Sequence, residues 1–177
     1  MAKKSNEDYV LNGKKTFVID GASADVLIVL ARTSGNSGEL AGLTLFILDS
    51  NSDEINSIRL DMADSRNYEN IEFNDVKCSE KNVLGAIESG GEVVERILDI
   101  GRIAMAAEML GNAESAFETT IEYLKQRKQF GVLIGTFQAL QHRAAKMFCE
   151  IELTKSAVMA AVHGADENSN ELQRLSS

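Results

Sequence analysis

The spacing of apolar residues changes near Gly85, and this change constrains the fold more than any other feature of the chain. Before it, short apolar runs alternate with turn residues, as in strands. After it, apolar residues recur every three or four positions, as on one face of a helix. Strands followed by helices predict an α+β chain with two domains, residues 1–86 and 87–177.

The first half predicts an antiparallel sheet. Asn12-Gly13 is a typical two-residue hairpin turn and lies between residues 9–11 and 16–19. Short strands at close spacing, without helices between them, favour an antiparallel sandwich or barrel over a parallel sheet. The further strands expected are residues 26–31, 43–48, 55–60 and 70–76.

The second half predicts two long helices joined by a short connection, and therefore an antiparallel pair. The first helix ends near Leu124, and the second runs from Phe137 to about His163, with Gly164 as its cap. Residues 170–177 resemble the first turns of a third helix. The apolar faces are too wide for two helices alone, so we expect a partial four-helix bundle that is part of something larger or pairs with another chain.

Composition excludes several classes of protein. The 18 basic and 27 acidic residues give a formal net charge of -9, which argues against nucleic acid or an anionic membrane as the main partner. No apolar run is long enough to span a membrane. Cys78 and Cys149 are far apart, so neither a disulfide framework nor a metal site is expected. We expect a reduced, cytoplasmic setting, with Cys149 buried as a small apolar residue.

The connection between the two long helices contains Arg127, Phe130 and Gly131. A guanidinium group offers paired donors that match phosphate oxygens, and a glycine lets the backbone approach a ligand closely. This combination is suited to a flat, anionic ligand. The alternative is a basic helix end, in which Lys125, Arg127 and Lys128 complement the helix dipole and the glycine follows as a cap.

Several motifs together resemble the acyl-CoA dehydrogenases. They are Tyr9-Val10-Leu11-Asn12-Gly13-Lys14-Lys15, Asn82-Val83-Leu84-Gly85, Gly90-Gly91, Leu98-Asp99-Ile100-Gly101-Arg102, Arg127-Lys128-Gln129-Phe130-Gly131 and Phe137-Gln138, in the family's order. That family has an N-terminal helical domain, a middle β-domain and a C-terminal four-helix domain. The resemblance covers nearly all 177 residues and matches the β-domain and the first half of the C-terminal domain. It implies a fragment that lacks the remaining parts.

The resemblance implies a reaction and a set of site residues. A glutamate takes the α-proton of an acyl-CoA, the β-hydrogen leaves as hydride to N5 of FAD, and an electron-transfer flavoprotein accepts the electrons. Arg127 and Gln138 would meet the FAD of a neighbouring subunit in a homo-oligomer, a dimer or tetramer, and Phe130 would pack against that cofactor. Asp99 and Arg102 would border the path of the CoA thioester, although an internal ion pair is an alternative.

Two positions depart from the family pattern. The family's Trp-Ile/Val-Thr/Ser segment reads Phe17-Val18-Ile19 here, so a hydroxyl that contacts the flavin is missing. The family's catalytic glutamate lies in a segment outside this span, and its alternative position falls on Gly101. No catalytic residue is therefore assigned. The alternatives are a non-catalytic interaction or oligomerisation module on the same scaffold, and a flavin oxidase or monooxygenase relative.

Overall fold

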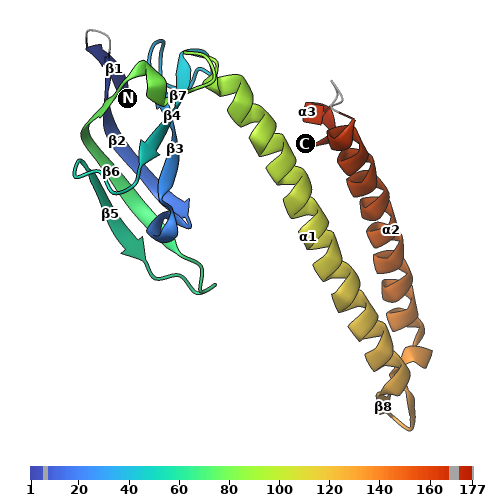
Figure 1. The fold of residues 1–177 in the computed structure, drawn as a ribbon. Coiled ribbons are helices and arrows are strands. Elements are labelled where there is room, and N and C mark those ends of the chain that lie inside the picture. Colours follow the sequence, from blue (N-terminus) through green and yellow to red (C-terminus); the bar gives the residue numbers. More distant parts are fainter. Residues whose placement is uncertain (6–7, 168–171, 177) are drawn as a thin grey trace. The chain divides into compact units, whose positions relative to one another are not determined.

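The structure is a computed structural model that describes residues 1–5, 8–167 and 172–176. These residues form two compact units, Met1–Val94 and Glu95–Ser177 (Figure 1). The first unit consists mainly of strands and the second mainly of helices, which confirms the predicted order of an antiparallel β domain followed by two long helices. The domain boundary expected after residue 86 stays a prediction.

The β unit consists of two antiparallel sheets. One has the strand order β1-β2-β6-β5, and the other has the order β3-β4-β7. The short 3-10 helices Gly21–Ser23 and Glu80–Asn82 connect β2 to β3 and β6 to β7. The strands are β1 (Ala2–Ser5), β2 (Asp8–Ile19), β3 (Val26–Arg32), β4 (Leu43–Asp49), β5 (Ile55–Leu60), β6 (Tyr68–Cys78) and β7 (Val83–Leu84).

Both sheets contribute to one apolar core, because alternate residues of a strand point to the same face. Phe46 of β4 is fully buried, and its ring meets that of Tyr9 on β2 edge to face, with 5.5 Å between the ring centroids. Two antiparallel sheets around a common core form a sandwich. The core also contains Ala2, Leu11, Leu27, Val29, Ala31, Leu48, Ile71, Phe73, Val76 and Cys78.

The hairpin predicted at Asn12-Gly13 is wrong. β2 continues through both residues, and the β2–β6 register shifts between Leu11 and Gly13. The Asn12 side chain bonds across the sheet to Asp75: its amide nitrogen donates to a carboxylate oxygen at 2.8 Å, and its oxygen accepts from the Asp75 backbone at 3.0 Å. A long partner strand therefore turns the Asn-Gly signal into a bulge instead of a turn.

The glycine pair at the start of α1 (Gly90–Gln126) is required by packing within the β unit. A Cβ atom on Gly91 would lie 2.3 Å from the carbonyl oxygen of Leu40, and one on Gly90 would lie 3.0 Å from that of Leu43. Real Cβ atoms do not approach a carbonyl oxygen as closely as 2.3 Å. The first turn of α1 therefore belongs to the β unit, and Gly91 tolerates no side chain.

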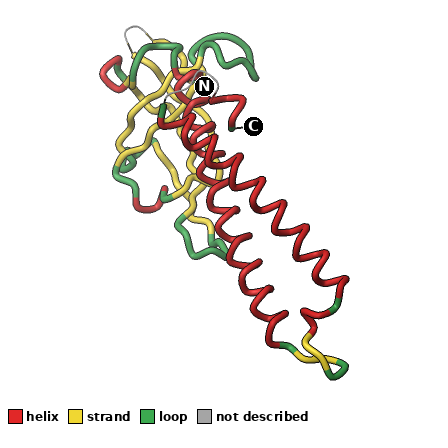
Figure 2. The backbone as a smooth tube through the Cα atoms, turned by 90° about the vertical axis from the view of Figure 1, so that its right-hand side faces the viewer, coloured by secondary structure: helices red, strands yellow, loops and turns green. Residues whose placement is uncertain are grey.

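The helical unit is an antiparallel pair, α1 and α2 (Gln138–Asp166), which lie side by side (Figures 1 and 2). Lys155 of α2 forms an ion pair with Glu114 of α1 at 2.9 Å. The rings of Phe117 and Phe148 lie 6.3 Å apart. The cap predicted at Gly164 is wrong, because α2 continues past it to Asp166 and the glycine is buried.

A third, short helix packs at one end of the pair. This helix, α3 (Leu172–Leu175), confirms the helical start expected within residues 170–177, of which 170, 171 and 177 lie outside the described residues. Leu172 joins Ile103 and Ala161 in a small core. Elsewhere, several large apolar side chains remain more than half exposed, among them those of Met105, Met109, Leu153 and Met159. None of the described helices is long and apolar enough to cross a membrane.

The two thiols are expected to react very differently. Cys78 is fully buried, and burial raises the pKa of its thiol to about 11. Cys149 is exposed, so its predicted burial is wrong for this chain. Because the thiolate is the reactive form, iodoacetamide at pH 8 should modify Cys149 and spare Cys78 until the chain is denatured. Peptide mass spectrometry checks this, and rapid native labelling of Cys78 would contradict the described core.

Candidate functional site

The connection between α1 and α2 is a small β-hairpin (Figure 2). Its strands, β8 (Lys128–Gln129) and β9 (Val132–Leu133), pair antiparallel around Phe130 and Gly131. These two residues have φ angles of 54° and 82°, and positive φ at both central positions defines a type I′ turn. The sequence predicted only a loop here. The sequence signal that could have revealed the hairpin is Gly131, because glycine readily adopts the positive φ that this turn requires.

Close backbone contacts fix the base of the hairpin. The Ile134 backbone donates to the Arg127 carbonyl at 2.9 Å, which extends the ladder beyond β8 and β9. In the short 3-10 helix Ile134–Thr136, a Cβ atom on Gly135 would lie 2.8 Å from the carbonyl oxygen of Leu124. Gly135 thus allows this segment to rest on the end of α1, and the Gln141 side chain donates to its carbonyl at 2.9 Å.

The three residues predicted to bind a cofactor lie at this end of the helix pair. Arg127 follows α1 directly and is exposed, and among the described residues no carboxylate pairs with its guanidinium. The Phe130 ring is 92% exposed and stands edge to face with Phe137, 6.3 Å away. Gln138 is the first residue of α2, whose N-cap makes no side-chain hydrogen bond to the first turn.

This arrangement has the chemistry of a site for a flat, anionic cofactor. An unpaired guanidinium and an open helix N-terminus both favour phosphate oxygens. An exposed aromatic ring offers a surface for a second ring system. Among the described residues, no cluster of histidine, cysteine and acidic side chains could hold a metal ion. The charge and the exposed ring at the hairpin therefore fit a dinucleotide such as FAD.

Asp99 and Arg102 form an ion pair near the other end of α1. The Arg102 guanidinium donates to the buried Asp99 carboxylate at 2.6 Å, and the Ser176 hydroxyl donates to the same oxygen atom at 2.8 Å. The Arg102 side chain is half exposed, so it retains donors that face outward. At about 1.5 Å of rise per residue, the helix from Asp99 to Gln126 is roughly 40 Å long. One copy therefore does not bring this pair to the hairpin.

Gly101 lies beside this ion pair, in the interior of α1, and a Cβ atom there would meet nothing within 4 Å. Replacing Gly101 with alanine should raise the free energy of unfolding by about 1 kcal/mol, because glycine is a poor helix former. Urea unfolding followed by circular dichroism at 222 nm measures this change. Gly91→Ala is the matched control and should destabilise the chain, because its Cβ would collide with Leu40. Destabilisation by Gly101→Ala would contradict the open environment.

The β unit presents its own exposed aromatic residue. Phe17 lies at a register shift in β2 with a φ of 53°, an unusual value for a bulky residue, and its ring is 60% exposed. The backbone nitrogen of Phe17 donates a hydrogen bond to the Asn70 side-chain oxygen at 3.3 Å. Bulges commonly redirect a side chain near a functional site. Ile19, where the family pattern has a hydroxyl, is 58% exposed.

Comparisons with known families agree with this fold. Residues 1–76 match the acyl-CoA dehydrogenase middle domain, and residues 88–176 match the acyl-CoA dehydrogenase C-terminal domain. The chain is therefore a homologue of flavoprotein oxidoreductases, with a β sandwich followed by long antiparallel helices. The chain belongs to the acyl-CoA dehydrogenase family, and it matches that family's middle domain and C-terminal domain.

Individual relatives show the same extent of similarity. The chain is 36% identical to the short-chain specific acyl-CoA dehydrogenase of Megasphaera elsdenii over 90% of its own length and 42% of that protein. It is 32% identical to the 3-(aryl)acrylate reductase of Clostridium sporogenes over 93% of its length and 44% of that protein. It therefore spans less than half the length of these two curated relatives.

Solved structures extend the likeness to three dimensions. The butyryl-CoA dehydrogenase of Megasphaera elsdenii superimposes with a TM-score of 0.86 at 33% identity, over 99% of this chain and 46% of that one. A glutaryl-coenzyme A dehydrogenase bound to glutaryl-CoA gives a TM-score of 0.80 at 31% identity, over 94% of this chain and 42% of that one. The hairpin and its residues therefore lie on a scaffold shared with these dehydrogenases.

Proposed function

We propose that this chain is part of an FAD-dependent acyl-CoA dehydrogenase that removes hydrogens from the α and β carbons of an acyl-CoA thioester. When bound, FAD supplies the acceptor for the hydride that leaves the β-carbon. The observation that carries the proposal is the group of Arg127, Phe130 and Gln138 at the hairpin. These side chains are exposed, and their charge and aromatic character suit an anionic, aromatic ligand. Homologues in this family bind FAD.

Each residue at the hairpin has a distinct role in this proposal. Arg127 donates charge-assisted hydrogen bonds to the cofactor pyrophosphate, and the open N-terminus of α2 adds a favourable dipole. Gln138 donates and accepts hydrogen bonds near the adenosine, and Phe130 packs against the cofactor. In the β unit, Phe17 presents a ring where the family has tryptophan.

The separation along α1 supports a site shared between copies of the chain. Asp99 holds Arg102 at one end of the helix, where Arg102 would donate to the CoA thioester, while the cofactor residues lie roughly 40 Å away at the other end. A homo-oligomer, dimer or tetramer, would place the hairpin of one copy beside the substrate site of another. The exposed apolar side chains of both helices, among them Met109 and Leu153, provide surface for that association.

The proposal also places the protein in the cytoplasm and has an electron-transfer flavoprotein accept its electrons. A relative that is 31% identical is named as the CarC subunit of a caffeyl-CoA reductase-Etf complex of Acetobacterium woodii. The names of this relative and of the 3-(aryl)acrylate reductase also favour a second candidate function, which is reduction of an α,β-unsaturated substrate at the same site. The third candidate is a non-catalytic interaction or oligomerisation module. Gly101 favours this candidate because glycine has no side chain that could act as a base.

A chimera tests the proposal. Residues 1–177 would replace the matching region of the Megasphaera elsdenii butyryl-CoA dehydrogenase, which is 33% identical over this region. The chimera should purify with FAD and should oxidise an acyl-CoA with an artificial electron acceptor. Circular dichroism and gel filtration establish that it folds and assembles. A folded, assembled chimera that neither retains nor rebinds FAD would refute the proposed cofactor site.

A further inference from the structure

Glu69 lies on the core face of β6 although its side chain is acidic. Alternate residues of a strand point to the same face, and Glu69 alternates with Ile71 and Phe73, both of which are buried. Glu69 itself is only 8% exposed. Among the residues that the structure describes, no hydrogen bond or ion pair joins its carboxylate to another group. An ionised carboxylate that is removed from water needs a cation or hydrogen-bond donors, so we expect a partner at this position.

Glu69 lines a polar cavity of about 220 Å³ between the start of β3 and the start of β6, which we call the Glu69 cavity. A Cβ atom on Gly21, another residue of its wall, would lie 3.5 Å from a carboxylate oxygen of Glu69. A water molecule occupies about 30 Å³ in the liquid, so the cavity has room for roughly seven. It is therefore large enough for a small organic molecule. The polar residues that line it are Ser23, Asp25, Ser50, Asn51, Ser57 and Glu69.

Asp25 supplies a second carboxylate from the opposite sheet. Its carbonyl accepts a hydrogen bond from the Ser50 backbone at 3.1 Å, which continues the ladder of β3 and β4 by one residue. Asp25 alternates with the buried residues Leu27 and Val29, so it also lies on the core face. The two sheets of a sandwich pack roughly 10 Å apart, which lets side chains from both reach one cavity. Asp25 is exposed, so one carboxylate lies inside the cavity and the other lies at its rim.

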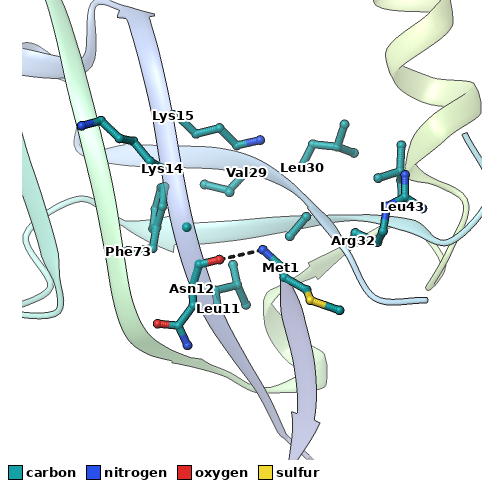
Figure 3. A pocket seen from close by; sticks show the side chains of 12 residues that line it. Met1, Leu11, Asn12, Lys14, Lys15, Val29, Leu30, Arg32, Leu43 and Phe73 are labelled. Atoms are coloured by element: carbon teal, nitrogen blue, oxygen red, sulfur yellow. Dashed lines mark hydrogen bonds between the residues drawn. The ribbon is translucent and has the colours of Figure 1, made fainter. Parts of the chain in front are cut away.

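Another cavity of the β unit carries the opposite charge. It has a volume of about 240 Å³ and lies toward the other end of β3, with Lys14, Lys15 and Arg32 in its walls (Figure 3). None of its described lining residues is acidic, and none of those that line the Glu69 cavity is basic. Positive and negative groups are thus separated along the sandwich, and the Glu69 cavity is the one suited to a cation.

We propose that the Glu69 cavity binds a short aliphatic diammonium cation. One ammonium group binds Glu69 inside the cavity and the other binds Asp25 at the rim, while serine hydroxyls accept their remaining N–H groups. The methylene groups between them contact Leu27, Ile55 and Ile71, which also line the cavity. These apolar contacts favour an organic cation over a metal ion, and the described residues contain no group of three metal-ligating side chains. The site lies outside the residues assigned to FAD and to acyl-CoA.

Isothermal titration calorimetry of the 177-residue chain tests the class of ligand. The probe is putrescine, a four-carbon chain with an amino group at each end, and butylamine is the control with one amino group. Calcium chloride is the control with the same charge, because the net charge of -9 attracts any cation to the surface. Putrescine should bind at a single site, at least tenfold more tightly than either control. Equal binding of putrescine and butylamine, or tighter binding of calcium, would overturn the assignment.

Variants of the two carboxylates locate the site. Glu69→Gln keeps the shape of the side chain and should weaken putrescine binding at least tenfold. Glu72→Gln is the matched control on the same strand, because Glu72 pairs with Lys14 at 3.0 Å outside the cavity, and it should change binding less than twofold. Asp25→Asn should reduce the affinity for putrescine to that for butylamine. Circular dichroism confirms that each variant remains folded, and equal effects of Glu69→Gln and Glu72→Gln would refute the site.

Arg59 is the alternative partner of Glu69 within the chain. It lies directly opposite Glu69 in the β5–β6 register and therefore on the same face of the sheet. Arg59 is exposed, and no ion pair joins the two side chains. Arg59→Gln should therefore change putrescine binding less than threefold. A gain of tenfold or more would show that Arg59 occupies the carboxylate, and would overturn the proposal.

Nuclear magnetic resonance locates the ligand without altering the protein. With putrescine bound, nuclear Overhauser effects should join its methylene protons to the methyl groups of Leu27 and Ile71, which line the cavity. Effects that involve only residues outside the Glu69 cavity would show that putrescine binds elsewhere and would refute the assignment.

Discussion

Replacing Phe46 with alanine should destabilise the β unit by about 3–5 kcal/mol, because it removes a ring from the centre of a closed core. Phe46 is fully buried, and its edge-to-face contact with Tyr9 links β4 of one sheet to β2 of the other. A loss of this size is a large fraction of the stability of a typical domain. Hydrogen exchange of the β6 amides, followed by peptide mass spectrometry, measures the change within the β unit.

Phe130→Ala is the matched control, since it removes the same side chain from a position that is 92% exposed. Its effect on stability should be within about 0.5 kcal/mol, as for surface substitutions generally. The comparison separates the two uses of phenylalanine in this chain. Similar destabilisation by both variants would contradict either the buried core at Phe46 or the exposed tip of the hairpin.

Replacing Arg127 with alanine should weaken FAD binding by about 10- to 150-fold, which corresponds to the 1.5–3 kcal/mol of a hydrogen bond to a charged group. This prediction rests on the proposed function. Its structural reason is that the Arg127 guanidinium is exposed, has no described ion-pair partner, and lies beside the open N-terminus of α2. Flavin content and FAD titration of the chimera that contains residues 1–177 provide the measurement.

Lys125→Ala is the control for Arg127→Ala, because it removes a nearby cation that already pairs with Glu122 at 2.8 Å. It should leave FAD binding within twofold of the parent chimera. Arg127→Lys should retain part of the affinity, because it keeps the charge but loses the planar fork of donors. If Arg127→Ala and Lys125→Ala had equal effects, Arg127 would have no specific role in binding the pyrophosphate.

Local signals in the sequence predicted most of the helical unit. Spacing of three and four residues located both long helices, and the short connection between them predicted an antiparallel pair. The same signals failed where a local preference competed with a remote partner. Asn12-Gly13 is a strong turn signal, but β6 pairs across it and Asp75 bonds to the Asn12 side chain, so the strand continues.

The candidate site was predictable as a set of residues and not as a structure. The motifs identified Arg127, Phe130 and Gln138, and their roles in cofactor binding stay predictions. The hairpin that carries Phe130 depends on φ angles at two residues and on the close approach of Gly135 to Leu124. Spacing along the chain does not report such contacts.

By itself, the sequence determined the order of β domain and helices, the residues of the connection, and the family. These features depend on the spacing of apolar residues and on short motifs, which are local. Only the tertiary structure decided that Asp99 bonds to both Arg102 and Ser176, and that β2 pairs with β6 on both sides of Asn12. The physical reason is that ion pairs and strand pairing join residues far apart in the chain, and their partners are selected by packing and burial.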